Sequence, residues 1–279
     1  MRISTASVVC LFIYLLSFTP SAFAQAVEKK GERKGEFYFS WGYNTEWYTN
    51  SNVYITQPSL GNDYVLQDIQ GHDHRGWDEG LLTKQLTIPQ YNYRFGYFID
   101  KKKNWAVEIN FDHTKYIIAD GQSAHIKGTL NERSVDTTIV FLQDSGFYYF
   151  LNNGANFLLF NIVKRWNIVT SKSSNEPIKV DFLGKAGIGP VIPHVENSFF
   201  GNANTPHFQL GGWNMGLEAA LRVTFYKYVY IEYTNKLDYA WYSGLKIYEG
   251  TAKQSFGTYE MILNFGVTFP VGKRVEEAK

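Results

Sequence analysis

The strongest constraint on the fold is a period-two alternation of apolar and polar residues that runs through long segments of the chain. In residues 211–225, one set of alternate positions is apolar and includes Trp213 and Leu217. The other set includes Glu218 and Arg222. Successive side chains of a β-strand point to opposite faces of a sheet, so this alternation predicts strands with one apolar and one charged face.

Eight segments carry the pattern, and together they predict an all-β antiparallel fold. They are residues 35–47, 86–99, 104–118, 155–169, 177–191, 208–225, 228–242 and 255–269. The connections alternate between short ones, at 100–104, 171–177 and 226–227, and longer ones, at 48–85, 119–154, 192–207 and 243–254. This order predicts an eight-stranded up-and-down barrel with tight turns at one end and long loops at the other.

Alternation alone leaves two barrels open, since a soluble barrel buries its apolar face and a membrane barrel exposes it. The apolar faces here are bulky, with 20 Tyr, 21 Phe and 7 Trp in the whole chain. Eight strands enclose a space that side chains only just fill, so this many rings would overfill it. The opposite faces mix acids, bases and glycine, which suits a narrow ion-paired interior. We therefore favour a transmembrane barrel over a secreted soluble one.

The N-terminus predicts export. Arg2, an apolar run from Val8 to Phe18 and the sequence Ala22-Phe23-Ala24 together make a secretory signal peptide, cleaved near Ala24 after Sec export. We expect charged tails at 25–34 and 271–279 and the barrel at 35–270. The only cysteine, Cys10, lies in the predicted signal peptide, so disulfides and thiol chemistry are not expected.

The chain has 27 Lys and Arg and 26 Asp and Glu, and Arg2 is the only charged residue of 1–24. The mature protein is therefore formally neutral, which gives no reason to expect nucleic acid as a partner. No cofactor motif is present, and we expect none.

The pattern resembles the superfamily of small eight-stranded outer-membrane β-barrels, the OmpA-type and OmpW-like proteins, over about residues 35–269. The last strand ends in Asn264-Phe265-Gly266-Val267-Thr268-Phe269, which is similar to the assembly signal of such proteins, although ten residues follow Phe269. The resemblance implies a porin-like fold in the cell envelope of a Gram-negative bacterium. It also implies the outer-membrane assembly machinery, outer-membrane lipids and lipopolysaccharide as partners, with short turns in the periplasm.

Two sets of residues follow from the predicted faces. We expect a lumen ion-pair network that holds the strand register and closes the lumen, formed by Arg94, Glu108, Asp112, Arg165, Glu218, Arg222, Glu232, Lys236 and Glu260. Membrane-interface aromatics are expected at Trp41, Trp47, Trp105, Trp166, Trp213 and Trp241.

Catalytic and metal chemistry have weaker signals, all at the loop end. His113, His194 and Glu196 are the candidates for a lipid A-modifying enzyme at the barrel mouth, because a histidine beside a carboxylate can activate a nucleophile. The H-x-S pattern of deacylases is absent, since Thr114-Lys115 follows His113. His72, His74 and Asp78 are candidate metal ligands in the first long loop.

The two longest loops are the favoured place for function. Residues 48–85 contain the strand-like pieces NVYIT and DYVLQDI, and residues 119–154 contain AHIKGTL and TTIVFLQ, which suit a hairpin above the membrane. Binding residues gather on loops that a rigid scaffold holds. The sequence thus predicts a structural or ligand-binding barrel, with a lipid A-modifying enzyme and a narrow solute channel as alternatives.

Overall fold

The computed structural model describes residues 32–73, 90–100, 104–151, 153–173 and 177–275. The predicted signal peptide and the candidate ligands His74 and Asp78 lie outside these ranges. The contacts of the chain divide it into two units, and the fold below is that of the unit Arg33–Lys273.

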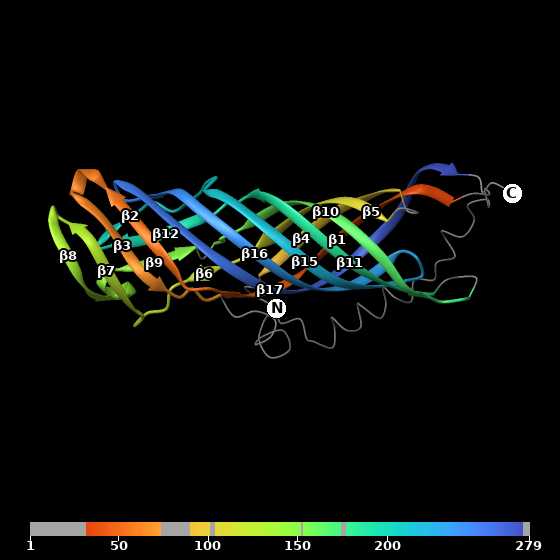
Figure 1. Ribbon diagram of the computed structural model, residues 1–279, viewed down its shortest axis with the longest axis horizontal. Helices are drawn as coiled ribbons and strands as arrows, with labels where there is room; N and C mark the ends of the chain where they lie inside the picture. The colour runs from red at the N-terminus through yellow and green to blue at the C-terminus, as the bar shows by residue number, and fades with distance from the viewer. Residues whose placement is uncertain (1–31, 74–89, 101–103, 152, 174–176, 276–279) are drawn as a thin grey trace, which may run out of the picture. The chain divides into compact units, whose positions relative to one another are not determined.

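Eight long antiparallel strands close into a barrel (Figure 1). Their order around the ring is β1-β4-β5-β10-β11-β15-β16-β17, and β17 pairs with β1 to complete it. Their bounds are β1 Glu32–Tyr48, β4 Tyr91–Asp100, β5 Trp105–His113, β10 Phe157–Thr170, β11 Ile178–Pro190, β15 Gly212–Phe225, β16 Val229–Ile247 and β17 Gly250–Val275. The predicted eight-stranded up-and-down barrel is confirmed.

The wall of the barrel is apolar outside and polar inside. Along β15, Trp213 and Leu217 face outward with exposed fractions of 60% and 63%, whereas Glu218 and Arg222 are buried in the interior. The other strands alternate in the same way, so the exterior carries a continuous belt of aromatic and aliphatic side chains. Between the two predicted orientations, the structure shows the one with the apolar face outward.

Tight turns define what we call the inner end of the barrel. Tyr226 and Lys227 join β15 to β16 with φ angles of 47° and 70°. Two consecutive residues with positive φ form a type I′ turn, whose twist matches that of the two strands it joins. The opposite end, where the longer connections lie, is called the outer end.

The prediction of a long connection at 243–254 is wrong. The strands β16 and β17 continue through this segment and pair with each other as a hairpin. Their ladder shifts register between Tyr242 and Leu245 and then pairs Leu245 with Ala252 and Ile247 with Gly250. The inward-facing positions change along this ladder from charged, at Lys236, to apolar. The strands continue beyond the belt because the second half of the hairpin buries apolar side chains in a separate core.

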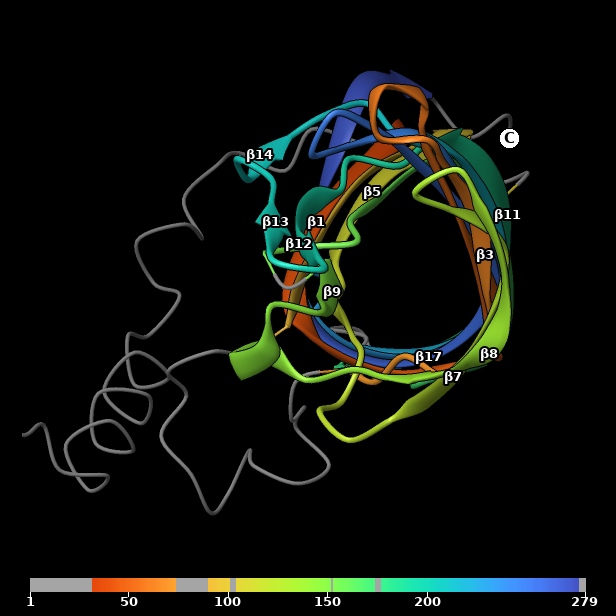
Figure 2. The same ribbon diagram turned by 90° about the vertical axis from the view of Figure 1, so that its left-hand side faces the viewer.

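That core belongs to a β-structure built from the longer connections, which we call the outer cap (Figure 2). Four strands continue the sheet from β17, in the order β2-β3-β7-β8. Their bounds are β2 Ser51–Gln57, β3 Asn62–Ile69, β7 Ser123–Leu130 and β8 Arg133–Val140. The predicted hairpin in residues 119–154 is present as β7 and β8, which pair along their whole length.

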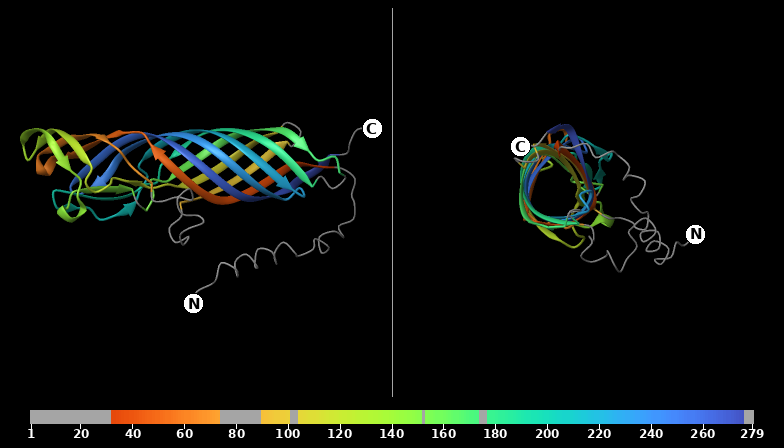
Figure 3. Two further views of the ribbon diagram at one scale, coloured as in Figure 1. Left: turned by 90° about the horizontal axis from the view of Figure 1, so that it is seen from below. Right: turned by 90° about the vertical axis from the view of Figure 1, so that its right-hand side faces the viewer.

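A second, five-stranded sheet completes the outer cap. It has the order β13-β12-β9-β6, and β14 pairs with β12. The bounds are β6 Tyr116–Ile117, β9 Tyr148–Leu151, β12 His194–Phe199, β13 Asn202–Ala203 and β14 His207–Phe208. Two 3-10 turns, η2 Pro58–Leu60 and η3 Gln143–Ser145, join cap strands. Figure 3 shows the cap strands gathered at one end of the barrel strands.

In the part of the chain that the structure describes, no helix has both the length and the apolar character to cross a membrane.

Candidate functional site

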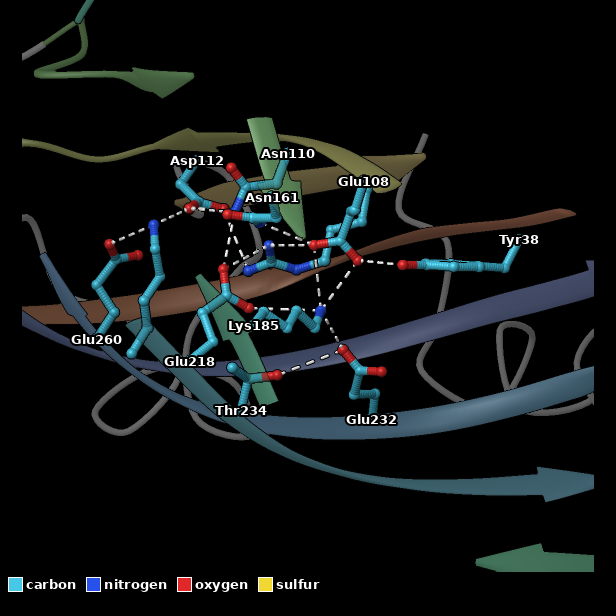
Figure 4. Close-up of polar contacts among 12 residues, drawn as sticks. Tyr38, Glu108, Asn110, Asp112, Asn161, Lys185, Glu218, Glu232, Thr234 and Glu260 are labelled. Atoms are coloured by element: carbon cyan, nitrogen blue, oxygen red, sulfur yellow. Dashed lines mark hydrogen bonds and ion pairs between the residues drawn. The ribbon is translucent and has the colours of Figure 1, made fainter. Parts of the chain in front are cut away.

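Among the described residues, ten charged residues in the barrel interior form a set of linked ion pairs, here called the charge network, part of which is drawn in Figure 4. They are Arg94, Glu108, Asp112, Lys185, Glu218, Arg222, Glu232, Lys236, Asp238 and Glu260. Each comes from an inward-facing position of a barrel strand. The same alternation that makes the exterior apolar therefore places these charges together.

Lys185 lies at the centre of the network. Its Nζ is 3.0 Å from Oε2 of Glu108, 3.0 Å from Oε1 of Glu232 and 3.4 Å from Oε2 of Glu218. All four side chains are almost completely removed from solvent. One ammonium group thus links carboxylates from three other strands, which fixes the position of those strands around the ring.

Arg94 links the same carboxylates to the outer part of the network. Its guanidinium lies 3.2 Å from Glu218, 3.5 Å from Asp112 and 3.7 Å from Glu108. Asn110 supports it, because its Nδ2 donates to Oε1 of Glu218 at 2.9 Å. Buried ion pairs offset their desolvation only when further hydrogen bonds satisfy the carboxylates, and Asn110 supplies one such bond to Glu218.

At the outer end of the network, one lysine meets three acids. Lys236 Nζ is 2.5 Å from Asp112, 2.7 Å from Asp238 and 3.2 Å from Glu260. The outer part of the network is therefore richer in acids than in bases. Even so, no group of three or more His, Cys, Asp or Glu side chains in the described ranges is arranged to hold a metal ion.

At the inner end, an arginine lies between two aromatic rings. The guanidinium carbon of Arg222 is 4.5 Å from the ring centroid of Tyr38 and 4.0 Å from that of Tyr230. Its Nε and Nη2 are each 2.7 Å from Oε2 of Glu232. The Tyr38 hydroxyl donates to Glu108 at 2.7 Å, so the aromatic layer is tied to the charge network.

The nine residues expected in a lumen network all lie in the interior, and eight of them belong to the charge network. Arg165 differs, because it pairs with Glu36 at 2.6 Å and covers the ring of Phe98 at 3.8 Å. Lys185 and Asp238 also belong to the charge network, and the prediction from the sequence did not include them. The sequence could have indicated that Lys185 belongs to the network, because in the neighbouring strands β11 and β15 it stands directly opposite Glu218.

An aromatic core lies next to the charge network on the side of the outer cap. The ring of Phe256 lies 4.6 Å from Tyr116, 5.2 Å from Tyr242 and 5.2 Å from Tyr48, measured between centroids. The ammonium of Lys236 is 5.4 Å from the ring of Phe157, which belongs to the same core. Charges and rings thus follow each other directly along the barrel interior.

The hydroxyls of Tyr48, Tyr116 and Tyr242 in this core are hydrogen-bonded, whereas those of Tyr64 and Tyr149 have no hydrogen-bond partner among the described residues. Burial raises the pKa of Tyr116 to about 12, although contacts with Ser51 and Gln254 oppose the rise. The Tyr116 hydroxyl lies 2.9 Å from Oγ of Ser51, which accepts from Nε2 of Gln254 at 2.9 Å. A neutral, paired hydroxyl can stay in an apolar core at little cost.

The three candidate catalytic residues do not form a constellation. His113 faces outward, stacks on Tyr91 at 4.6 Å, and its Nδ1 lies 2.8 Å from Oδ1 of Asn156. His194 lies edge-on against Phe208 at 4.8 Å. No hydrogen bond or ion pair among the described residues joins His113, His194 and Glu196.

The candidate metal site is only partly within the described residues. His72 is exposed, and its backbone bridges Trp47 and Ile117.

The expected interface tryptophans all point outward. Their exposed fractions are Trp41 38%, Trp47 46%, Trp105 48%, Trp166 48%, Trp213 60% and Trp241 42%.

A closed antiparallel ring with a charged interior and an apolar exterior has the polarity of a transmembrane barrel, the inverse of a soluble one. The fold is therefore that of an eight-stranded transmembrane β-barrel. The resemblance seen in the sequence, to small outer-membrane barrels, is confirmed at the level of the fold.

Solved structures to which this chain is similar include Neisserial surface protein A, at 10% identity and a TM-score of 0.33, covering 84% of this chain and 97% of that chain. They also include OprG from Pseudomonas aeruginosa, at 12% identity and a TM-score of 0.36, covering 86% and 99%. Ail, the attachment invasion locus protein of Yersinia pestis, matches at 14% identity and a TM-score of 0.32, covering 85% and 99%. No family model and no curated protein matches the sequence.

Proposed function

We propose that this chain is a surface-binding protein of a Gram-negative outer membrane, and that it binds partners through its outer cap. The observation that carries this proposal is that the long connections form a packed β-structure with its own aromatic core. A cap of this kind holds a binding surface in a fixed shape above the membrane. Ordering the surface in advance lowers the entropy lost on binding.

The exterior supports the membrane location. Large apolar side chains such as Phe95, Ile109, Phe160 and Leu217 are about half exposed or more on the barrel wall. Soluble monomers rarely expose a continuous apolar surface of this extent. The predicted signal peptide provides the export step, and the end of β17 fits recognition by the outer-membrane assembly machinery.

The outer cap ends in an open strand edge. In the described ranges β8 pairs only with β7, so its other edge leaves backbone groups without a neighbouring strand. Its sequence, RSVDTTIV, has five β-branched residues and neither proline nor glycine. Natural sheets commonly protect such edges with proline, lysine or bulges. An edge that lacks proline, lysine and a bulge suits strand addition, in which an extended peptide pairs with the backbone.

The test uses an array of immobilised extended peptides and the purified protein in lipid nanodiscs. Backbone N–H groups of adjacent strand residues point to opposite edges, so of Thr137→Pro and Thr138→Pro one blocks the open edge and the other breaks the β7–β8 ladder. Limited proteolysis shows which variant keeps the hairpin. We expect that variant to lose peptide binding at least tenfold. Unchanged binding in it, or no binding by the wild type, would remove strand addition as the function.

Among the described residues, no contact favours either alternative, the lipid A-modifying enzyme or the narrow solute channel. One measurement distinguishes the enzyme from a binding protein. Mass spectrometry of lipid A from cells with and without the protein should show the same acyl chains. Loss or gain of one chain would replace the binding proposal with catalysis and direct attention to His113, which faces outward at the outer end of β5.

A further inference from the structure

Two lysines mark the place where the apolar belt ends on β16 and β17. Below them the outward-facing residues of β16 are apolar or aromatic up to Tyr239 and Trp241, except for Asn235, which accepts hydrogen bonds from the hydroxyls of Tyr233 and Tyr259. The next charged residues on this outward face are Lys246 on β16 and Lys253 on β17, and both are exposed. They stand diagonally across the ladder, because Lys246 pairs with Thr251, two residues before Lys253.

The bulge in β16 leaves open space beside these lysines. The register shift between Tyr242 and Leu245 places Ser243 and Gly244 across from Lys253. Gly244 has a φ of +65°, and a Cβ added there would meet nothing within 4 Å. Both bulge residues are exposed, so no bulky side chain of the bulge fills the surface next to the ammonium groups.

Neither ammonium group is neutralised by the protein. In the described part of the chain, the side chains of Lys246 and Lys253 form no ion pair or hydrogen bond, although the backbone of Lys246 contacts the side chains of Asn204 and Gln209. By contrast, Lys127 pairs with Asp136 at 3.4 Å and Lys179 with Asp181 at 2.9 Å. Two like charges on adjacent strands repel each other. An anion placed between the two ammonium groups would attract both of them and offset their repulsion.

An apolar surface lies directly below the pair. Trp241 packs edge-on against Tyr239 at 4.6 Å and stands opposite Trp213 in the ladder. Aromatic rings of this kind favour the boundary between hydrocarbon and head groups. A ligand that fits both parts has an anionic group above and a hydrocarbon chain below.

We propose that Lys246 and Lys253 bind the phosphate group of a phosphorylated lipid in the outer leaflet, whose acyl chain lies along Trp241 and Trp213. Two lysines provide charge-assisted hydrogen bonds to phosphate oxygens. The inference rests on the proposed membrane location of the barrel. It assigns one side of the wall, β15 to β17, as a preferred lipid contact.

The experiment compares lipids that differ in head-group charge. Wild-type protein is reconstituted with equal amounts of phosphatidic acid and phosphatidylcholine of the same chains, and native mass spectrometry counts the lipids that stay bound. We expect retained phosphatidic acid to exceed phosphatidylcholine at least fivefold. The Lys246→Gln/Lys253→Gln variant should lower the ratio to about one.

The matched control carries Lys172→Gln and Lys227→Gln, two exposed lysines in the inner-end turns. It should keep the wild-type ratio, and an equal loss in both variants would overturn the site in favour of general charge. Equal competition by inorganic phosphate would also overturn it, because the apolar half would then contribute nothing. Insertion into vesicles is measured first. Failure to insert would refute the proposed membrane location, whereas insertion without lipid preference would refute only this site.

Discussion

Arg222 is the lumen residue whose loss should destabilise the barrel most clearly. Arg222→Ala removes the guanidinium between Tyr38 and Tyr230 and leaves Glu232 with Lys185 as its one remaining cationic partner in the network. Removing one member of a buried ion pair costs about 3–5 kcal/mol. We expect a clearly lower unfolding temperature in detergent, measured by circular dichroism.

Two further variants test the cause. His72→Ala, which changes an exposed side chain of the outer cap, should alter the unfolding temperature by much less. Glu232→Gln in the Arg222→Ala background should recover part of the loss, because it removes the carboxylate left with too little positive charge. Equal effects of Arg222→Ala and His72→Ala would contradict an interior position of Arg222.

Position 96 requires glycine because an aromatic ring lies directly against it. A Cβ added to Gly96 would overlap with the ring of Tyr38, which lies over it inside the barrel. Gly96→Ala should therefore destabilise the barrel by about 1–3 kcal/mol through overpacking. Denaturant titration in detergent measures it. In a Tyr38→Ala background the same glycine substitution should cost much less, and a cost independent of Tyr38 would show that the contact is not responsible.

At the scale of elements, the outer cap depends on its aromatic core. Phe256→Ala removes the ring that Tyr116, Tyr242 and Tyr48 all contact. Truncating a buried phenylalanine costs about 3–5 kcal/mol. Because Phe256 lies beyond the charge network, we expect the cap to loosen while the barrel stays folded. Protease cleavage within β7 and β8 should accelerate, whereas the heat-induced shift in gel mobility should persist. Loss of both together would mean that cap and barrel unfold as one.

The alternation predicted the barrel elements because each barrel strand meets lipid on one face and the interior on the other. It could not predict the course of residues 243–254, because the bulge at Ser243 and Gly244 breaks the period. Nor could it predict that β17 pairs with β2, because the paired residues Lys253 and Tyr54 are nearly two hundred residues apart in the sequence. The members of the charge network could be predicted in part from the sequence, because the pairing of Lys185 with Glu218 follows once the strand order is known.

At the scale of the barrel as a whole, two layers of opposite character follow each other along the interior. One is the charge network, with paired side chains such as Lys185, and the next is the aromatic core around Phe256. An ion would have to displace both to pass. This predicts no single-channel conductance in planar bilayers.

Single variants should keep the lumen shut. Lys185→Ala leaves the aromatic core in place, and Phe256→Ala leaves the ion pairs in place, so we expect neither to conduct. Conductance steps should appear only when both substitutions are combined, after insertion of each variant into the bilayer has been verified by protease protection. Steps from the wild-type protein would show that the paired charges line a conduit rather than fill it. Steps from Lys185→Ala alone would show that the aromatic core does not seal the outer end. The combined variant therefore tests whether the two layers act independently, which single substitutions cannot do.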